Sequence, residues 1–375
     1  MFLFLHVKGK GEMLSLQFKR LIHSIKKSPV GFAFDIDGVL MQSKNPILPY
    51  ARDTVTLLQD HKIPFVLLTN GGGQTEASRV SFLNKSLSLK NPLRTSQIVL
   101  SHTPMRNLTG KYNRVLVVGG DDPQTREVAQ SYGFQEVIRP IDIVREAPNI
   151  WPFIRYTREE IQALSKPVDL RQPIDAVFVF NDPRDMGTDT QIVIDALCSE
   201  NGVLGTRRGI GSSKPSVPII FSNMDLLWST GYPIPRFGQG AFRLTIRELY
   251  KQLNNAELED IVLGKPWPVS YTYAENVLND EWKLLNGDRS GANEIPELGV
   301  KPKEQLVENV YMVGDNPQSD ISGGNNYGWE TILVETGVYK EGDFHKYPTL
   351  AKPTFGIFPN VWDGVTSALK RHQVI

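Results

Sequence analysis

The chain has 375 residues, enough for two packed domains or for one domain that carries a large insertion. Its 41 basic and 41 acidic side chains balance, so the net charge gives no indication of nucleic acid as a partner. The single cysteine, Cys198, cannot form an intrachain disulfide, and no apolar run is long enough to span a membrane. A hydrophobic content of 40% is typical of a folded globular protein.

Residues 1–29 differ from the rest of the chain. They hold six basic residues against one acid, Glu12. Four apolar residues recur at helical spacing and would share one helix face: Leu14, Phe18, Leu21 and Ile25. A basic, amphipathic segment that is poor in acids is typical of a mitochondrial import signal. The segment therefore predicts a mitochondrial location. The alternative is a cytoplasmic protein whose first helix is solvated or touches a membrane surface.

After Pro29 the sequence alternates between short apolar runs and helical patterns. Residues 31–35 read as a buried strand, 51–61 as a helix and 63–69 as a second buried strand, which together form a βαβ unit. Three similar strands and a final helix are expected near the end of the chain, at 309–314, 331–335, 354–358 and 360–371. The pattern predicts an α/β fold with a doubly wound, parallel, Rossmann-like core sheet.

The middle of the chain has an α/β pattern of its own. Strands are expected at 114–118, 135–138 and 175–180, with helices at 122–132 and 190–200. Proline-containing segments on both sides would serve as hinges. We therefore expect an inserted α/β cap domain. The expected divisions are an N-terminal segment at 1–29, the first part of the core at 30–103, the cap at 104–216 and the second part of the core at 217–375.

The strongest chemical signal is the pair Asp35 and Asp37, which stands at the end of the first strand and is followed by Gly38. Ligands bind at this edge of an open parallel sheet. A carboxylate that ends a buried strand requires a cation or hydrogen-bond donors, and Mg²⁺ prefers such oxygen ligands. Taken alone, the pair also fits a solvated turn rich in aspartate.

Three further segments favour the chemical reading. Thr69, Asn70 and Gly71 follow the second strand, where a hydroxyl and successive backbone N–H groups can hold a phosphate. Lys265 supplies an isolated cation, which alone would read as a surface lysine in a turn. Acidic and amide side chains follow a late strand, at Asp315, Asn316 and Asp320. Each segment is a weak signal, but their order on successive α/β units is a strong one.

These four segments resemble motifs I to IV of the haloacid dehalogenase (HAD) superfamily. The insertion between the second and third motifs is similar to that of class IIA, whose members carry a C2-type cap. Ser222-Asn223-Met224-Asp225 resembles the T-N-P-D segment of that class. Ser101-His102-Thr103-Pro104 resembles the cat-eye-syndrome critical-region protein 5 group of mitochondrial HAD-like phosphatases within the class. The likeness extends over roughly residues 30–375.

The resemblance implies a role for each motif. Asp35 would be the nucleophile, and Asp37 would protonate the leaving oxygen and then activate water. Mg²⁺ would be held by the Asp35 carboxylate, the Asp37 backbone carbonyl and Asp315. The phosphoryl oxygens would be bound by Thr69, Asn70, Gly71 and Lys265. Asn316 and Asp320 would support this arrangement from behind, through a water molecule or through Lys265.

Other residues are candidates for contacts with the rest of the substrate. Asn223 and Asp225 are expected near the phosphate, and Arg184 of the cap would contact a second anionic group. The glycines at 71–73 depart from the usual class IIA sequence at this position and would make the loop that faces the cap more flexible.

The predicted function is a Mg²⁺-dependent phosphatase that hydrolyses a small phosphorylated metabolite. No nucleic-acid partner and no membrane span are expected, and a homodimer is left open. Two alternatives remain at this point. One is a binding or scaffold protein with the same fold and little turnover, and the other is an enzyme that transfers the phosphoryl group to an acceptor other than water.

Overall fold

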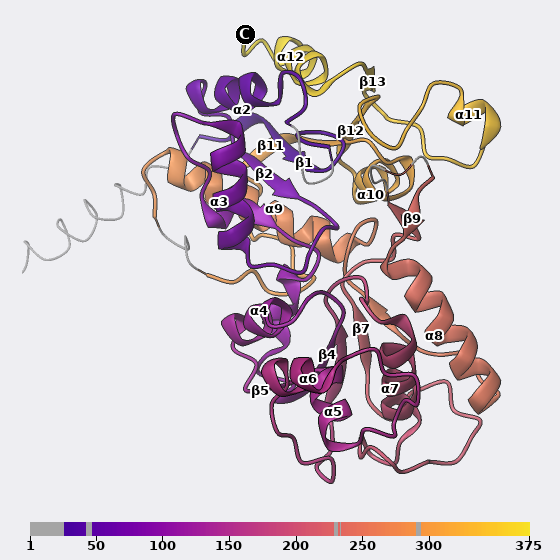
Figure 1. Cartoon of the computed structure of the whole chain (residues 1–375). Coiled ribbons are helices and arrows are strands. Elements are labelled where there is room, and N and C mark those ends of the chain that lie inside the picture. Colours follow the sequence, from indigo (N-terminus) through magenta and orange to yellow (C-terminus); the bar gives the residue numbers. More distant parts are fainter. Residues whose placement is uncertain (1–25, 43–46, 229–231, 233, 290–293) are drawn as a thin grey trace, which may run out of the picture.

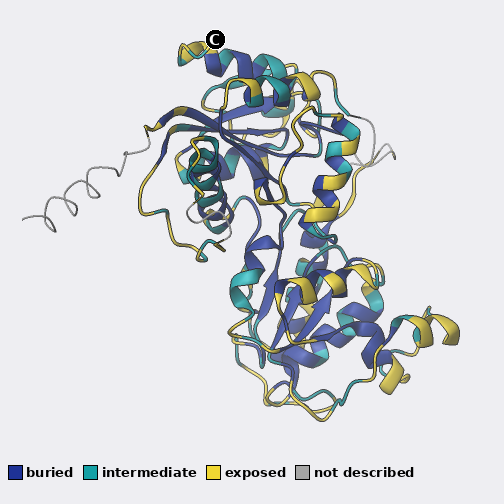
Figure 2. Ribbon diagram, turned by 90° about the vertical axis from the view of Figure 1, so that its left-hand side faces the viewer, coloured by how far each residue is buried: buried dark blue, intermediate teal, exposed yellow. Residues whose placement is uncertain are grey.

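The computed structural model describes residues 26–42, 47–228, 232, 234–289 and 294–375. The expected N-terminal helix lies almost entirely outside these residues. Figure 1 shows two α/β units, one above the other, and the upper unit holds both the first strand and the last helix. Figure 2 shows the interior of both units as buried, with exposed residues on the outer helices and loops.

The upper unit is built on a six-stranded sheet in the order β13-β12-β11-β1-β2-β3. Its strands are β1 (Ser28–Phe34), β2 (Phe65–Leu68), β3 (Ile98–Val99), β11 (Val307–Gly314), β12 (Glu330–Val334) and β13 (Gly356–Phe358). All neighbouring strands are parallel, with Ala33 opposite both Met312 and Val66. β1 is central because its apolar run can be buried on both faces.

Helices cover both faces of this sheet. The helices of the upper unit are α2 (Ala51–Asp60), α3 (Glu76–Leu87), α9 (Pro268–Leu285), α10 (Ser322–Tyr327), α11 (Asp343–Lys346) and α12 (Val361–Arg371). Apolar side chains of α2, α3 and α12 pack with Phe32 and Phe34 on one face. Those of α9 pack with Ala33 on the other face. The prediction of a doubly wound parallel core is confirmed.

The lower unit has its own parallel sheet, in the order β10-β7-β6-β4-β5. Its strands are β4 (Arg114–Val118), β5 (Glu136–Ile138), β6 (Ala176–Val179), β7 (Ile219–Phe221) and β10 (Ile261–Val262). Its helices are α4 (Gln124–Tyr132), α5 (Pro140–Glu146), α6 (Arg158–Leu164), α7 (Met186–Cys198) and α8 (Gln239–Asn254). A separate antiparallel hairpin is formed by β8 (Leu227–Trp228) and β9 (Arg236–Phe237).

The expected end of the cap at residue 216 is wrong. β7 pairs with β6, and β10 pairs with β7, so both strands belong to the cap sheet. α8 packs against α7 of the same unit through buried apolar side chains. Local composition could not show this, because strand pairing across the sheet decides where these short segments belong. The cap sheet therefore runs to Val262, and the chain re-enters the core at Lys265 and α9.

Candidate active site

Three neighbouring core strands end at one edge of the sheet, and each is followed by a predicted site residue. Asp35 follows β1, Thr69 follows β2, and Asp315 follows β11. The parallel arrangement brings their carboxyl ends together, as the general rule for ligand sites in open α/β sheets requires. Lys265 reaches the same edge from the end of the cap strand β10.

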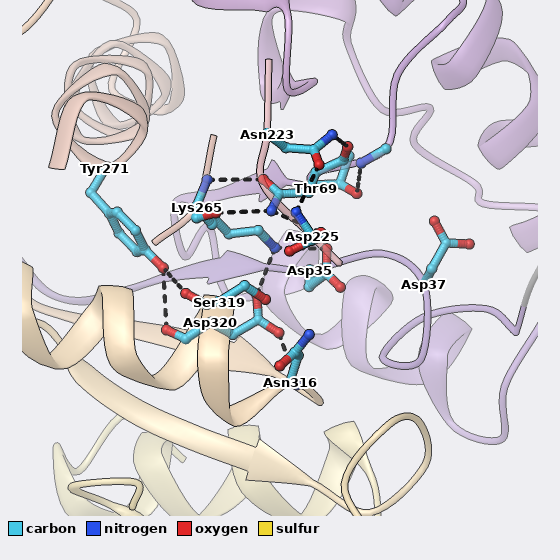
Figure 3. A network of polar contacts seen from close by, with 12 residues as sticks. Asp35, Asp37, Thr69, Asn223, Asp225, Lys265, Tyr271, Asn316, Ser319 and Asp320 are labelled. Carbon is cyan, nitrogen blue, oxygen red and sulfur yellow. Dashed lines mark hydrogen bonds and ion pairs between the residues drawn. The ribbon is translucent and has the colours of Figure 1, made fainter. Parts of the chain in front are cut away.

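Lys265 joins these segments through its ammonium group (Figure 3). Its Nζ donates to Asp35 Oδ1 at 2.9 Å and to Asp320 Oδ1 at 2.6 Å. The side chain is buried, with 1% of the residue exposed. Burial alone would lower the pKa of Lys265, but the carboxylates of Asp320 and Asp35 outweigh this and raise it. The lysine is therefore a permanent cation within the site.

Three carboxylates gather around this one ammonium. Oxygen atoms of Asp35, Asp315 and Asp320 all lie within 4.8 Å of one another, and we call these three residues the carboxylate cluster. Burial, followed by the charges of Asp320 and Asp35, raises the pKa of Asp315 well above its usual range. The carboxylates outnumber the cation, so this group of oxygen ligands fits a divalent metal ion such as Mg²⁺.

Asp315 is held tightly from both sides. The Val338 N–H donates to its Oδ2 at 2.6 Å. A Cβ atom added at Gly337 would lie only 1.8 Å from the same oxygen, and one at Gly38 would lie 2.3 Å from it. These glycines are needed because the backbone passes so close to the carboxylate.

Asp320 lies in the short turn Pro317–Ile321 and is completely buried. Its Oδ1 accepts a hydrogen bond from Lys265 Nζ, and its Oδ2 accepts one from the Asn316 N–H at 3.0 Å. Tyr271 of α9 holds the same turn by donating to the Ser319 carbonyl at 3.0 Å. Both oxygens of Asp320 already have protein donors, which suits the predicted role of orienting Lys265.

Asp37 stands apart from this network (Figure 3). Its side chain is 45% exposed, and Arg79 Nη2 of α3 donates to its Oδ2 at 3.1 Å. Although part of the side chain is exposed, desolvation by the surrounding protein raises the pKa of Asp37 to about 6, and the charge of Arg79 opposes the shift. A carboxyl group with this pKa can exchange a proton near neutral pH. The sequence did not single out Arg79, because a lone arginine in a helix carries no motif.

Asn70 joins the loop after β2 to Lys265. Its Oδ1 accepts the Lys265 N–H at 2.9 Å, and its Nδ2 donates to the Lys265 carbonyl at 3.0 Å. Asp225 Oδ2 accepts from the same Nδ2 at 2.9 Å. Asn223 Nδ2 donates to the Asn70 carbonyl at 3.1 Å. The structure thus brings Asn223 and Asp225 to the site, where their contacts position Asn70.

The loop after β2 is tightly packed. Gly71 N donates to Thr69 Oγ1 at 3.0 Å. A Cβ atom at Gly72 would lie 2.9 Å from the carbonyl of Phe180 in the cap, and one at Gly73 would lie 2.2 Å from Asn181 Nδ2. The expectation that these glycines loosen the loop is wrong, because they allow it to pass directly against the cap.

Arg184 has a different setting. Its guanidinium forms an exposed ion pair with Asp121 at 3.1 Å, within the cap. The nearby helix α7 is capped by Asp185, whose Oδ1 accepts the Thr188 N–H at 3.2 Å. Among the described residues, Arg184 forms no hydrogen bond or ion pair with the core site. Its predicted contact with a second anionic group stays a prediction.

Comparison with known proteins identifies relatives across nearly the whole chain. A family model for haloacid dehalogenase-like hydrolases matches residues 32–135, and a second HAD-hydrolase-like model matches residues 262–364. A mitochondrial hydrolase of Saccharomyces cerevisiae is 48% identical over 359 residues, which cover 94% of this chain and 99% of that protein. A Schizosaccharomyces pombe fusion of a cardiolipin synthase (CMP-forming) with a mitochondrial hydrolase is 42% identical, and the match covers 93% of this chain and 55% of that protein.

Solved structures share the fold at low sequence identity. The p-nitrophenyl phosphatase of Archaeoglobus fulgidus is 17% identical with a TM-score of 0.56, covering 92% of this chain and all (100%) of that chain. The NagD protein of Escherichia coli K-12 is 20% identical with a TM-score of 0.52, covering 89% and 97%.

The mitochondrial location predicted for this chain is confirmed by the two hydrolase relatives. Within the described residues, none of the helices is both long and apolar enough to cross a bilayer. Four motifs in order, their meeting at one sheet edge and the identity to the yeast hydrolase agree with one another. The chain belongs to the haloacid dehalogenase-like hydrolase family.

Proposed function

We propose that this protein is a Mg²⁺-dependent phosphatase that hydrolyses a small phosphorylated metabolite through an aspartyl-phosphate on Asp35. The observation that carries the proposal is the buried ammonium of Lys265, 2.9 Å from Asp35 Oδ1 and surrounded by the carboxylate cluster. This arrangement concentrates one nucleophile, one fixed cation and several metal-binding oxygens at a single sheet edge. Such a group of charges suits a phosphoryl substrate.

In the first step a carboxylate oxygen of Asp35 attacks the phosphorus, and the bond from phosphorus to the leaving oxygen breaks. Asp37 gives its proton to that oxygen, so the alcohol leaves neutral. In the second step Asp37 takes a proton from water, and the water oxygen attacks the phosphorus. The bond from phosphorus to the Asp35 oxygen breaks, so phosphate is released and the Asp35 carboxylate is restored. The pKa of Asp37, raised to about 6 by burial, allows both transfers near neutral pH.

The remaining groups bind and orient. Lys265, the Thr69 hydroxyl and the backbone N–H groups of Asn70 and Gly71 would hold the phosphoryl oxygens. Asp35 and Asp315, with the Asp37 carbonyl, would hold Mg²⁺. When bound, the ion would neutralise the carboxylates and the phosphoryl charge, so that one anion can approach another. Asp320 keeps Lys265 in place from behind.

Two relatives bear on the substrate. The Archaeoglobus fulgidus neighbour is named for the hydrolysis of p-nitrophenyl phosphate, a small phosphomonoester. The Schizosaccharomyces pombe relative joins its hydrolase to a cardiolipin synthase, and this favours a second candidate, a phosphomonoester used in phospholipid synthesis. Both candidates share the phosphomonoester group that the site is proposed to cleave.

The test is phosphate release from a panel of small phosphomonoesters, including glycerol phosphates and phosphatidic acid. It compares the wild type with Asp35→Asn, each in Mg²⁺ and in EDTA. We expect release that requires Mg²⁺ and is lost in the variant. Label from ¹⁸O-water in the released phosphate would show that water is the acceptor. A folded protein that binds Mg²⁺ and releases no phosphate from any substrate would instead support the binding-protein alternative.

A further inference from the structure

A second buried polar group lies where the core meets the cap, and the proposed chemistry does not use it. It comprises Glu76, His102, Thr103, Arg106 and Tyr132, which we call the seam network. Tyr132 comes from α4 of the cap, whereas Glu76 begins α3 of the core. His102 is completely buried, and Glu76 is 2% exposed. The segment 101–104 that holds His102 stood out in the sequence without a role.

The hydrogen bonds of the seam network run in one direction. His102 Nε2 accepts the Gly73 N–H at 3.1 Å, so that nitrogen carries no proton. Its Nδ1 therefore holds the proton and donates to the Tyr132 hydroxyl at 2.6 Å. Tyr132 in turn donates to Glu76 Oε1 at 2.6 Å. The Glu76 carboxylate, through Tyr132, thereby favours the tautomer in which Nδ1 carries the proton and Nε2 is free to accept from the loop.

The rest of the seam network keeps Glu76 ionised. Thr103 Oγ1 donates to Glu76 Oε1 at 2.7 Å, and Arg106 Nη2 donates to Oε2 at 3.2 Å. The pKa values agree with this assignment of protons. Burial lowers the pKa of His102 to about 4. Burial by itself would raise the pKa of Glu76, but nearby positive charge, including that of Arg106, and the hydroxyl hydrogen bonds lower it. His102 is neutral and Glu76 is charged at neutral pH.

His102 also closes the loop from the side. Its ring stacks on Phe180 of the cap, with centroids 5.2 Å apart. A Cβ atom at Gly72 would lie 2.8 Å from the His102 ring, so the loop and the ring are in direct contact. His102 provides the acceptor for the Gly73 N–H, within the loop that begins at Thr69.

We propose that His102 is a positioning residue for phosphate binding. Through the Gly73 N–H it holds the loop at 70–73 in the conformation that binds the phosphoryl group. The inference rests on the proposed phosphatase function, because the loop is taken to bind phosphate. It predicts that phosphate binding depends on the hydrogen-bond acceptor at the Nε2 position and not on the imidazole ring itself.

The test uses two variants that remove the same ring and keep different hydrogen bonds. In His102→Gln the amide oxygen can reach the Nε2 position and accept from Gly73. In His102→Asn the shorter side chain reaches only the Nδ1 position and leaves the buried Gly73 N–H without an acceptor. We expect KM for p-nitrophenyl phosphate, and the inhibition constant of inorganic phosphate, to rise roughly tenfold or more in His102→Asn. Both should stay within about threefold of the wild type in His102→Gln.

The loss of the ring and of its stacking on Phe180 is common to both variants, so a purely structural role would lower thermal stability in both and leave KM alike. Equal KM values in the two variants, whether raised or unchanged, would overturn the proposal. A readout that needs no turnover is the hydrogen exchange of the Gly73 amide, which should be faster in His102→Asn than in His102→Gln. If the wild type released no phosphate, the proposed function would fail, and this exchange would still decide whether His102 holds the loop.

Discussion

The carboxylate cluster and the seam network are both buried groups of charge, yet they differ in how the charge is compensated. In the carboxylate cluster three carboxylates lie together, and Lys265 forms ion pairs with two of them, Asp35 and Asp320. In the seam network the one carboxylate, Glu76, receives donors from Tyr132, Thr103 and Arg106. The first group has an excess of negative charge, and the second is satisfied within the protein.

This difference in charge compensation distinguishes a candidate ligand site from a structural hydrogen-bond network. Buried carboxylates without enough donors are costly, so an excess of them requires a cation from outside. A buried carboxylate with a full set of donors needs nothing further and makes the backbone around it rigid. We therefore expect the carboxylate cluster to respond to metal ions and the seam network to respond to pH.

The largest effect is expected for the nucleophile. Asp35→Asn keeps the shape of the side chain but removes the charge that attacks phosphorus. We expect the rate of phosphate release to fall by roughly 10³-fold or more, measured at saturating Mg²⁺ and p-nitrophenyl phosphate. Asp53→Asn, on the core helix α2, is the matched control and should be fully active. A residual rate in Asp35→Asn within tenfold of the wild type would contradict the proposed nucleophile.

Removal of the Lys265 ammonium beside the carboxylate cluster should lower the stability of the protein. Lys265→Met leaves Asp35 and Asp320 buried without their cation, so the free energy of unfolding should fall by about 3–5 kcal/mol. Urea denaturation in EDTA measures the loss. Lys283→Met, which breaks a partly exposed pair with Asp280, serves as the control. If the two variants were equally stable, Lys265 would not be compensating the buried charge.

The stability of the seam network should depend on pH through His102. The pKa of His102 is about 4 in the folded protein, against an ordinary value of 6.5. Between these pH values the unfolded chain binds a proton that the folded protein does not, so stability falls as the pH drops from 6.5 towards 4. The loss should reach roughly 3 kcal/mol at the lower end. Urea denaturation across this range compares the wild type with His102→Gln, which removes the titrating group. The proton assignment would be wrong if the two curves ran parallel.

Mg²⁺ should stabilise the protein through the carboxylate cluster. At an ion concentration about 100 times the dissociation constant, the free energy of unfolding should rise by about 2.7 kcal/mol relative to EDTA. Asp315→Asn should remove most of this gain. In EDTA the variant should be at least as stable as the wild type, because one uncompensated charge is gone. Calorimetry with and without Mg²⁺ makes the measurement, and an undiminished gain in Asp315→Asn would place the ion elsewhere.

The smallest effect is expected for Arg184. Its ion pair with Asp121 is exposed, so Arg184→Ala should change the free energy of unfolding by at most about 0.5 kcal/mol. The kcat/KM for p-nitrophenyl phosphate should not change, because this substrate has no second anionic group. Kinetics with substrates that carry a second anion test the predicted contact. A KM that is higher in Arg184→Ala than in the wild type for those substrates alone would support the contact. A KM that is the same in the variant and the wild type for every substrate would exclude it.

The order of the four motifs along the chain was enough to predict most of the residues that meet at the candidate active site. Asp35, Thr69 and Asp315 each end a parallel strand, and parallel strands place such residues together whatever the side chains between them. The partner of Asp37 could not be predicted in this way, because Arg79 meets it only after α3 has packed on the sheet. The seam network was missed for the same reason. It joins residues as far apart as Glu76 and Tyr132.

The sequence alone determined the fold class, the family and the residues at the ends of the core strands, because these depend on local patterns and on motif order. Tertiary structure decided what those patterns leave free. Pairing of short strands assigned β7 and β10 to the cap, beyond the expected limit at residue 216. The glycines at 71–73, which the sequence suggested would form a loose loop, pack closely against the cap. Both outcomes depend on hydrogen bonding and close packing between segments that are distant in the sequence, and local sequence patterns do not specify such contacts.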